Sequence, residues 1–188
     1  RAIFTVYSRA NRSLVDELQH KKTMSVGEWL TFLNHYDLLQ TGQISTFGAK
    51  MVFKWSMIRA RPDHTAASER KMRQLTFIDF VEALVRVACL MALPIDAELD
   101  AAEAHDAGEY LHALEQADAL HEFIVSHKVG WQGQPRQPSG RCVAHLISLL
   151  IRTAVPNRKI SDKILDKDRQ LTEADVSKHA ARRQTGAH

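Results

Sequence analysis

The sequence predicts an all-α protein: a helix–loop–helix pair followed by a C-terminal helical extension. Apolar residues recur three and four positions apart along most of the chain, the spacing of one face of a helix. The strict alternation typical of half-buried strands is almost absent. Two segments, Met24–Leu33 (MSVGEWLTFL) and Leu75–Leu84 (LTFIDFVEAL), also share an order of residue types, which indicates a duplicated unit: an apolar residue, a hydroxyl, two variable residues, an acid, an aromatic and an apolar helix face.

Capping and breaking residues mark where the helices begin and end. Ser25 stands three residues before Glu28, and Thr76 three before Asp79, the spacing of a capping box. Pro94 ends the second of these helices, because proline cannot continue one. The periodic segments predict helices over 2–10, 26–37, 46–60, 77–92, 97–128, 141–155 and 172–183.

Changes in composition divide the chain into four parts. Residues 1–94 hold the helix–loop–helix pair, 95–130 form an acidic helical segment, 131–140 are a flexible Gly/Pro linker, and 141–188 form the C-terminal extension. The extension contains Cys142–Val155 (CVAHLISLLIRTAV), whose few charges are untypical of a free helix. We expect it to pack on the pair, or on a neighbouring protein.

Composition narrows the class of protein. A hydrophobic content of 45% and a charged content of 25% are ordinary for a globular chain, and a net charge of +3 gives little support to nucleic-acid binding. The apolar runs are shorter than the ~20 residues of a membrane helix, so we expect no membrane contact. Cys89 and Cys142 are interpreted as free thiols of a cytoplasmic protein. The start without methionine suggests a fragment or a processed product.

The two matching segments resemble the EF-hand superfamily. In that family a loop of about twelve residues supplies calcium ligands, and an apolar residue at position 8 forms the strand that pairs two loops. Placing Met24 and Leu75 at position 8 puts Glu28 and Asp79 at position 12, where the family has an acid. The resemblance therefore implies two loops paired through Met24 and Leu75.

The remaining loop positions depart from the family. Calcium takes six to eight oxygen ligands, but these loops offer few carboxylates, and Lys22 and Arg73 replace the turn glycine. Asp37–Gly48 lacks side-chain oxygens at ligand positions 3 and 12 and is interpreted as the linker between the units, with a degenerate loop as the alternative. We therefore expect no cofactor. The remaining metal candidate lies near the C-terminus, where a solvated turn is the competing interpretation: Asp166, Asp168, Thr172 and Asp175.

The resemblance extends to degenerate EF-hand-like modules of ciliary and flagellar proteins and covers about residues 3–94. It implies a non-catalytic docking or scaffold module of a cytoskeletal, axonemal assembly, in the cytoplasm or the cilium. The expected partner is a protein, either an amphipathic helix or a microtubule-associated assembly. The residues expected to form the peptide groove or the core are Trp29, Phe32, Leu33, Met51, Trp55, Met57, Phe77, Phe80, Leu84 and Met91.

Two other functions remain open, and an enzyme is not expected. Glu109 and His112 have the Glu-x-x-His spacing of di-iron bundles, but they lie in a long acidic segment where Glu and His at helical spacing are interpreted as surface residues. Phosphate-binding loops and nucleophile elbows are absent from the sequence. The alternatives are a calcium-responsive sensor and a nucleic-acid-binding module that uses Arg59, Arg61, Arg70, Lys71 and Arg73.

Overall fold

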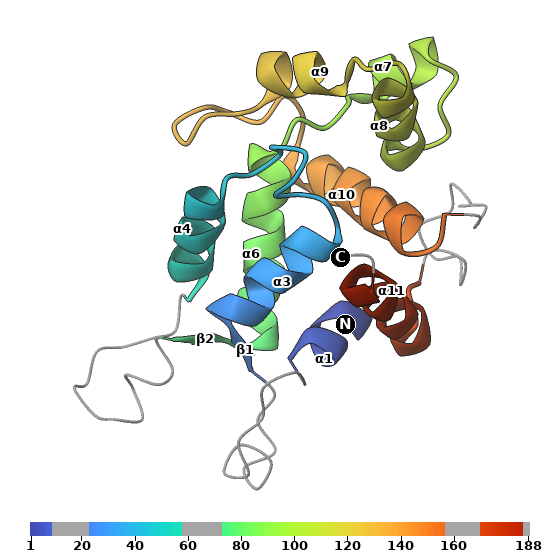
Figure 1. The fold of residues 1–188 in the computed structure, drawn as a ribbon. Helices are drawn as coiled ribbons and strands as arrows, with labels where there is room; N and C mark the ends of the chain where they lie inside the picture. Colours follow the sequence, from blue (N-terminus) through green and yellow to red (C-terminus); the bar gives the residue numbers. More distant parts are fainter. Residues whose placement is uncertain (9–22, 58–72, 157–169, 186–188) are drawn as a thin grey trace, which may run out of the picture.

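The computed structural model describes residues 1–8, 23–57, 73–156 and 170–185, and these residues are mostly helical, as the sequence predicts (Figure 1). None of the helices in these ranges is both long and apolar enough to cross a bilayer. In chain order they are α1 (Ala2–Tyr7), α3 (Val26–His35), α4 (Thr46–Ser56), α6 (Phe77–Leu90), α7 (Asp96–Ala101), α8 (Ala107–Gln116), α9 (Leu120–His127), α10 (Ser139–Ala154) and α11 (Glu173–Thr185).

A short antiparallel sheet joins the two matching segments. β1 (Met24–Ser25) pairs with β2 (Gln74–Leu75), and Met24 lies opposite Leu75. The side chains of both residues are fully buried, so the pairing lies in the core rather than at the surface. Each strand leads directly into a helix, β1 into α3 and β2 into α6.

The first turns of α3 and α6 are closed in the same way. The Ser25 hydroxyl accepts the N–H of Glu28 at 3.3 Å, and the Glu28 carboxylate accepts the N–H of Ser25 at 2.7 Å. In α6 the Thr76 hydroxyl accepts the N–H of Asp79 at 3.3 Å, and Asp79 accepts the N–H of Thr76 at 2.9 Å. Both predicted capping boxes are confirmed, because this contact involves only residues three apart in the sequence.

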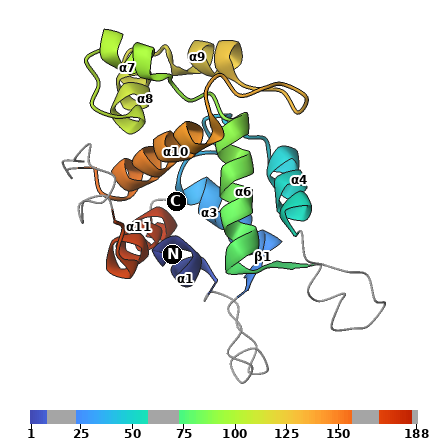
Figure 2. The same cartoon turned by 180° about the vertical axis from the view of Figure 1, so that it is seen from behind.

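Helix α6 is the central element, with α4 packed on one side and α10 on the other (Figures 1 and 2). Aromatic side chains fill the space around its first half. The rings of Trp29 in α3 and Phe80 in α6 meet edge to face with their centroids 6.0 Å apart, and Phe4 of α1 lies 5.4 Å from Phe80. The Trp29 indole N–H donates to the carbonyl of Ala49 at 3.0 Å and so ties α3 to α4.

The connection between α3 and α4 is fastened to the end of α6. The buried Gln43 amide accepts the N–H of Ala92 at 2.9 Å and donates to the carbonyl of the same residue at 3.1 Å. The segment Asp37–Gly48, interpreted from the sequence as a linker, therefore carries a structural contact. Gly42, with φ 79°, occupies the left-handed region that glycine adopts without strain.

The single helix predicted over 97–128 is wrong, since α7, α8 and α9 replace it. Glu103 and Asp118 have φ values of 52° and 57°, in the left-handed region where an α-helix cannot continue. The buried Asp106 carboxylate starts α8 by accepting the N–H of Glu109 at 3.0 Å, and it binds the Arg152 guanidinium of α10 at 2.6 Å. Tertiary pairing with α10 thus overrides the helix propensity of this alanine-rich segment.

Helix α10 packs within the chain, against α6 and α8, which corresponds to the first of the two predicted alternatives. Its buried face includes Leu146 and Leu150. Cys142 lies on the same face, and burial raises the pKa of its thiol to about 11. The thiols of Cys142 and Cys89 are both free.

Helix α11 closes the fold against α1 and α3 through buried polar contacts. The His179 Nε2–H donates to the carbonyl of His35 at 2.8 Å, and the Tyr7 hydroxyl lies 2.9 Å from Nδ1 of the same His35. The ring of His179 packs at 4.7 Å from that of Tyr36. Burial lowers the pKa of His35 and of His179, and this favours their neutral forms.

Candidate docking surfaces

A groove of about 450 Å³ runs between α6 and α10 and reaches the start of α1. Hereafter it is called the groove. Among the residues that line it, only Arg1 and Gln170 have polar side chains. The side chains along its walls are aliphatic or aromatic: Ile3, Phe77, Phe80, Val81, Leu84, Val85, Val143, Leu146, Ile147, Leu150, Ile151 and Leu171.

The upper walls of the groove face solvent. Val81 of α6 is 43% exposed and Ile147 of α10 is 44% exposed, although both are large and apolar. Ile78, on the same helix as Val81, is exposed as well. Below them Phe80 and Leu146 are buried, so the groove has an apolar floor and open apolar walls. A contiguous exposed surface of this kind marks a site of interaction more often than isolated exposed residues do.

A second apolar surface lies on α4, which packs on α6 from the side opposite α10 (Figures 1 and 2). Phe47, Met51 and Trp55 follow each other at four-residue spacing, so they share one face of this helix. Phe47 is 70% exposed and Trp55 is 49% exposed. Trp131, from the segment after α9, is 47% exposed and meets Trp55 edge to face at 5.1 Å. These four residues are called the aromatic patch.

Gly48 makes room for Trp131 at the base of the aromatic patch. A Cβ atom at position 48 would lie 3.3 Å from Cζ2 of the Trp131 indole and 3.2 Å from Cγ1 of Ile44. The absence of a side chain at this position therefore lets the indole ring rest on α4 itself.

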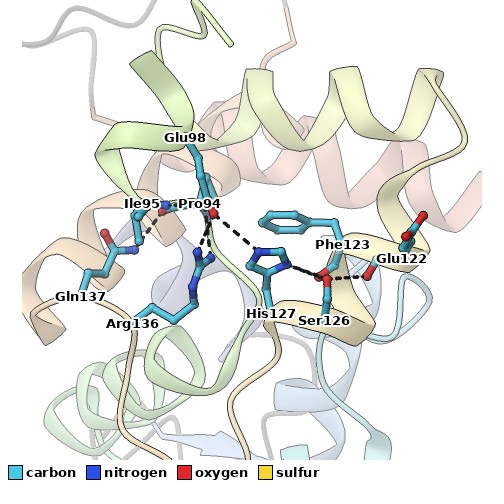
Figure 3. Close-up of polar contacts among 9 residues, drawn as sticks. All are labelled: Pro94, Ile95, Glu98, Glu122, Phe123, Ser126, His127, Arg136 and Gln137. Atoms are coloured by element: carbon cyan, nitrogen blue, oxygen red, sulfur yellow. Dashed lines mark hydrogen bonds and ion pairs between the residues drawn. The ribbon is translucent and has the colours of Figure 1, made fainter. Parts of the chain in front are cut away.

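The segment that carries Trp131 is anchored at both ends, and Figure 3 shows its second anchor. The N–H of Val129 donates to the last carbonyl of α6 at 3.3 Å. Beyond Trp131, the Arg136 guanidinium donates to both carboxylate oxygens of Glu98, at 2.5 and 3.2 Å, and the Gln137 amide donates to the carbonyl of Pro94 at 2.9 Å. The sequence predicts a flexible linker here; the structure shows an irregular segment with fixed ends.

Glu98 is the centre of this anchor. It also accepts the N–H of Ile95 at 2.9 Å, and Nε2 of His127 lies 3.5 Å from its Oε1 (Figure 3). Burial alone raises the pKa of the Glu98 carboxyl, but the hydrogen bonds from Arg136 and Ile95 outweigh it, and the net pKa is lowered. The carboxylate is therefore charged at neutral pH and holds the start of α7, the end of α9 and the segment after it together.

Ser126, His127 and Glu98 have the composition of a catalytic triad, and the Ser126 hydroxyl lies 2.8 Å from Nδ1 of His127 (Figure 3). The Ser126 hydroxyl donates to the carbonyl of Glu122 at 2.8 Å. Nδ1 of His127 also lies 2.9 Å from the carbonyl of Phe123, and whether this nitrogen donates or accepts depends on the tautomer of the ring. In the tautomer that donates from Nδ1 to the Phe123 carbonyl, Ser126 and His127 hold the last turn of α9, and His127 links it to Glu98 of α7.

The residues predicted to form a groove or core separate into three groups. Only Phe77, Phe80 and Leu84 line the groove, and Phe80 also belongs to the core. Met51 and Trp55 lie on the aromatic patch and do not line the groove. The remaining residues pack in the core, where Met57 is only partly buried: Trp29, Phe32, Leu33, Met57 and Met91.

The sequence reasoning missed Val81, Ile147, Phe47 and Trp131. Val81 stands four residues after Phe77, and Phe47 four before Met51, so helical spacing could have identified both. The positions of Ile147 and Trp131 depend on how α10 and the segment after α9 fold back, which local spacing does not reveal.

Of the metal candidates, Thr172 and Asp175 are described, and they cap α11. The Asp175 carboxylate accepts the N–H of Thr172 at 3.1 Å and the hydroxyl of Thr172 at 2.8 Å. Asp166 and Asp168 lie outside the described residues. Among the residues described, no three His, Cys, Asp or Glu side chains gather closely enough to hold a metal ion.

The basic residues proposed for nucleic-acid binding fall mostly outside the described ranges. Only Arg73 is described, and its side chain is exposed next to β2. Arg59, Arg61, Arg70 and Lys71 lie outside the described residues.

We compared the chain with protein-family models, with curated proteins and with solved structures, and none of the three comparisons finds a match.

Proposed function

We propose that this protein is a non-catalytic docking module that holds the apolar face of a partner helix in the groove between α6 and α10. The observation that carries the proposal is the groove itself, whose floor and walls are apolar while Val81 and Ile147 on its rim remain half exposed. Burying such a surface against a partner would stabilise the complex by the hydrophobic effect.

A helix is the partner that fits the shape of the groove. Two antiparallel or crossing helices leave between them a channel into which a third helix can insert one row of side chains. Aliphatic walls made of Val, Ile and Leu suit the apolar stripe of an amphipathic helix. At the α1 end, the Arg1 guanidinium lies 5.6 Å from the Phe77 ring and offers a cation to an acidic residue of the partner.

We further propose that α1 to α3 and α4 to α6 are two EF-hand-like units related by duplication. The pairing of Met24 with Leu75 and the equivalent capping boxes that follow both residues support this proposal. The resemblance to modules of ciliary and flagellar proteins then suggests where to look for the partner, in a cytoskeletal assembly of the axoneme.

The test compares two valine substitutions that differ only in place. Val81→Lys puts a charge on the groove wall, and Val26→Lys puts the same charge on α3, where the valine is similarly exposed (43% and 38%). Wild type and both variants are used to retain proteins from an axonemal extract and from a cytosolic extract, with quantification by mass spectrometry.

We expect a partner from the axonemal extract that wild type and Val26→Lys retain and that Val81→Lys retains at least about tenfold less, as for a central interface residue. Cross-linking should place an amphipathic helix of that partner on α6 and α10. Equal retention by the two variants would contradict the groove as the docking site, and a partner found only in the cytosolic extract would contradict the axonemal assignment.

A further inference from the structure

The aromatic patch on α4 is a second surface whose chemistry differs from that of the groove. We propose that it binds an acidic amphipathic helix of a partner protein. This inference is independent of the groove, since it is carried by α4 and Trp131, which do not line that site.

The spacing of the patch residues indicates a helical ligand. Phe47, Met51 and Trp55 form a row at four-residue intervals, and successive members of such a row lie about 6 Å apart along the helix. Rows of this kind are the ridges that pack into the grooves of a second helix. Trp131 stands beside the row and meets Trp55 edge to face, so it forms a wall along one side.

The charged side chains next to this row indicate the charge of the ligand helix. Lys50 and Lys54 are exposed and border the row, because Lys50 stands three positions after Phe47 and Lys54 three positions after Met51. Helix α4 contains no acidic residue, and within the described residues no carboxylate forms an ion pair with either lysine. A ligand helix with Glu or Asp beside its apolar stripe would complete both contacts. The same face of a second copy would instead bring lysines together.

The patch is also preorganised. Trp131 rests on Gly48, and its segment is fixed by Val129 at one end and by the Arg136–Glu98 pair at the other. Two tryptophans held in place offer large contact areas with little loss of conformational entropy on binding, which is typical of residues that dominate interface energies.

Single-stranded nucleic acid fits this surface less well. Bases need accessible ring faces along a cationic track. Here the Trp131 ring lies against Gly48 and meets Trp55 edge to face at 84°, and the face carries two lysines and no arginine. A short oligothymidylate therefore serves as a competing probe.

The test is a selection from a displayed library of helical peptides that share an apolar stripe and carry random residues on both sides of it. The targets are wild type, Trp55→Ala and the double variant Lys50→Glu with Lys54→Glu. Lys178→Glu on α11 is the control for a charge reversal elsewhere. Thermal melting of each target verifies its fold.

We expect wild type and Lys178→Glu to enrich peptides with Glu and Asp beside the stripe. The double variant should enrich Lys and Arg instead, and Trp55→Ala should bind the wild-type winners at least about tenfold more weakly. The proposal is overturned if nothing is enriched on wild type, if the charge preference survives the double reversal, or if oligothymidylate displaces the selected peptides at equal concentration. Val81→Lys, a substitution in the groove, should enrich the same peptides as wild type. Failure of the patch proposal can therefore be distinguished from failure of the groove proposal.

Discussion

The groove and the aromatic patch flank the same helix, α6, and are built in different ways. The groove requires α1, α6 and α10, which are far apart in the sequence, to pack correctly. The patch needs one face of α4 and a single residue, Trp131, delivered by an anchored segment. The groove therefore reports on the whole tertiary assembly, whereas the patch depends on α4 and on the contacts that anchor the Trp131 segment. Perturbations of the core, of α11 and of the anchor should therefore affect the two surfaces unequally.

The largest loss of stability is expected from a substitution in the core that supports both surfaces. Phe80 is buried against Phe4, Trp29 and Phe32. Phe80→Ala should lower the free energy of unfolding by about 3–5 kcal/mol, because it removes a buried ring and leaves a cavity. Chemical denaturation measures the change, and we expect binding at both surfaces to weaken when this variant is tested near its lowered melting temperature.

Phe47→Ala is the matched control, because the Phe47 ring is 70% exposed. Its free energy of unfolding should stay within about 0.5 kcal/mol of wild type. Only binding at the aromatic patch should weaken. Equal stability of the two alanine variants would contradict the assignment of Phe80 to the core.

A fall in pH is expected to weaken binding at the groove more than binding at the aromatic patch. Burial lowers the pKa of His35 and His179 below the ordinary value of about 6.5, and nearby cations, Arg183 at His35 and Arg182 at His179, act in the same direction. Below pH ~6.5 the unfolded chain therefore takes up protons that the folded chain does not, and stability falls with falling pH. Above that pH the contribution of both neutral histidines is complete.

Because α11 packs on α1, which borders the groove, acid should weaken groove binding between pH 7.5 and pH 5.5 and leave patch binding nearly unchanged. His179→Gln keeps a donor for the His35 carbonyl and removes one titrating group. Its melting temperature should fall less than that of wild type over this pH range. Since His145 in α10 also has a pKa lowered by burial, His145→Gln is measured in parallel. An unchanged pH dependence in His179→Gln would count against the role of α11.

The parts of the fold that the sequence predicts are those set by neighbouring residues. The capping boxes at Ser25 and Thr76 depend on a residue three positions away, and both are present. Most helices were likewise placed within a few residues by their periodicity. The helix predicted over 97–128 fails because the break at Asp106 is stabilised by Arg152, which is remote in the sequence.

The candidate site was predictable only in part, for the same reason. Helical spacing identifies Phe77, Phe80 and Leu84 as one face of α6, but it cannot tell that α10 supplies the opposite wall. Helical spacing also groups Trp55 with Trp29, although the Trp29 side chain is buried in the core and the Trp55 side chain is half exposed. Gly and Pro around Trp131 suggest flexibility, and nothing local reveals that Glu98 holds the segment through Arg136.

The smallest change in stability is expected when the ion pair that anchors the Trp131 segment is removed. Glu98→Gln removes the charge that binds Arg136, and because the pair is partly exposed, the free energy of unfolding should change by less than about 1 kcal/mol. The segment should nevertheless loosen, since Gln137 and Val129 alone would then fix it. Hydrogen exchange measured by mass spectrometry should become faster over residues 129–137, and patch binding should weaken while groove binding stays the same.

Glu82→Gln removes a comparable ion pair, with Arg86 on α6, and should leave exchange over residues 129–137 unchanged. Faster exchange in both variants would indicate a general loss of stability rather than release of the anchor. Slow exchange in Glu98→Gln combined with weaker patch binding would show that the charge of Glu98, and not the position of Trp131, matters to the ligand. If only Glu98→Gln exchanges faster and loses patch binding, a single carboxylate on α7 positions the indole that the α4 face presents.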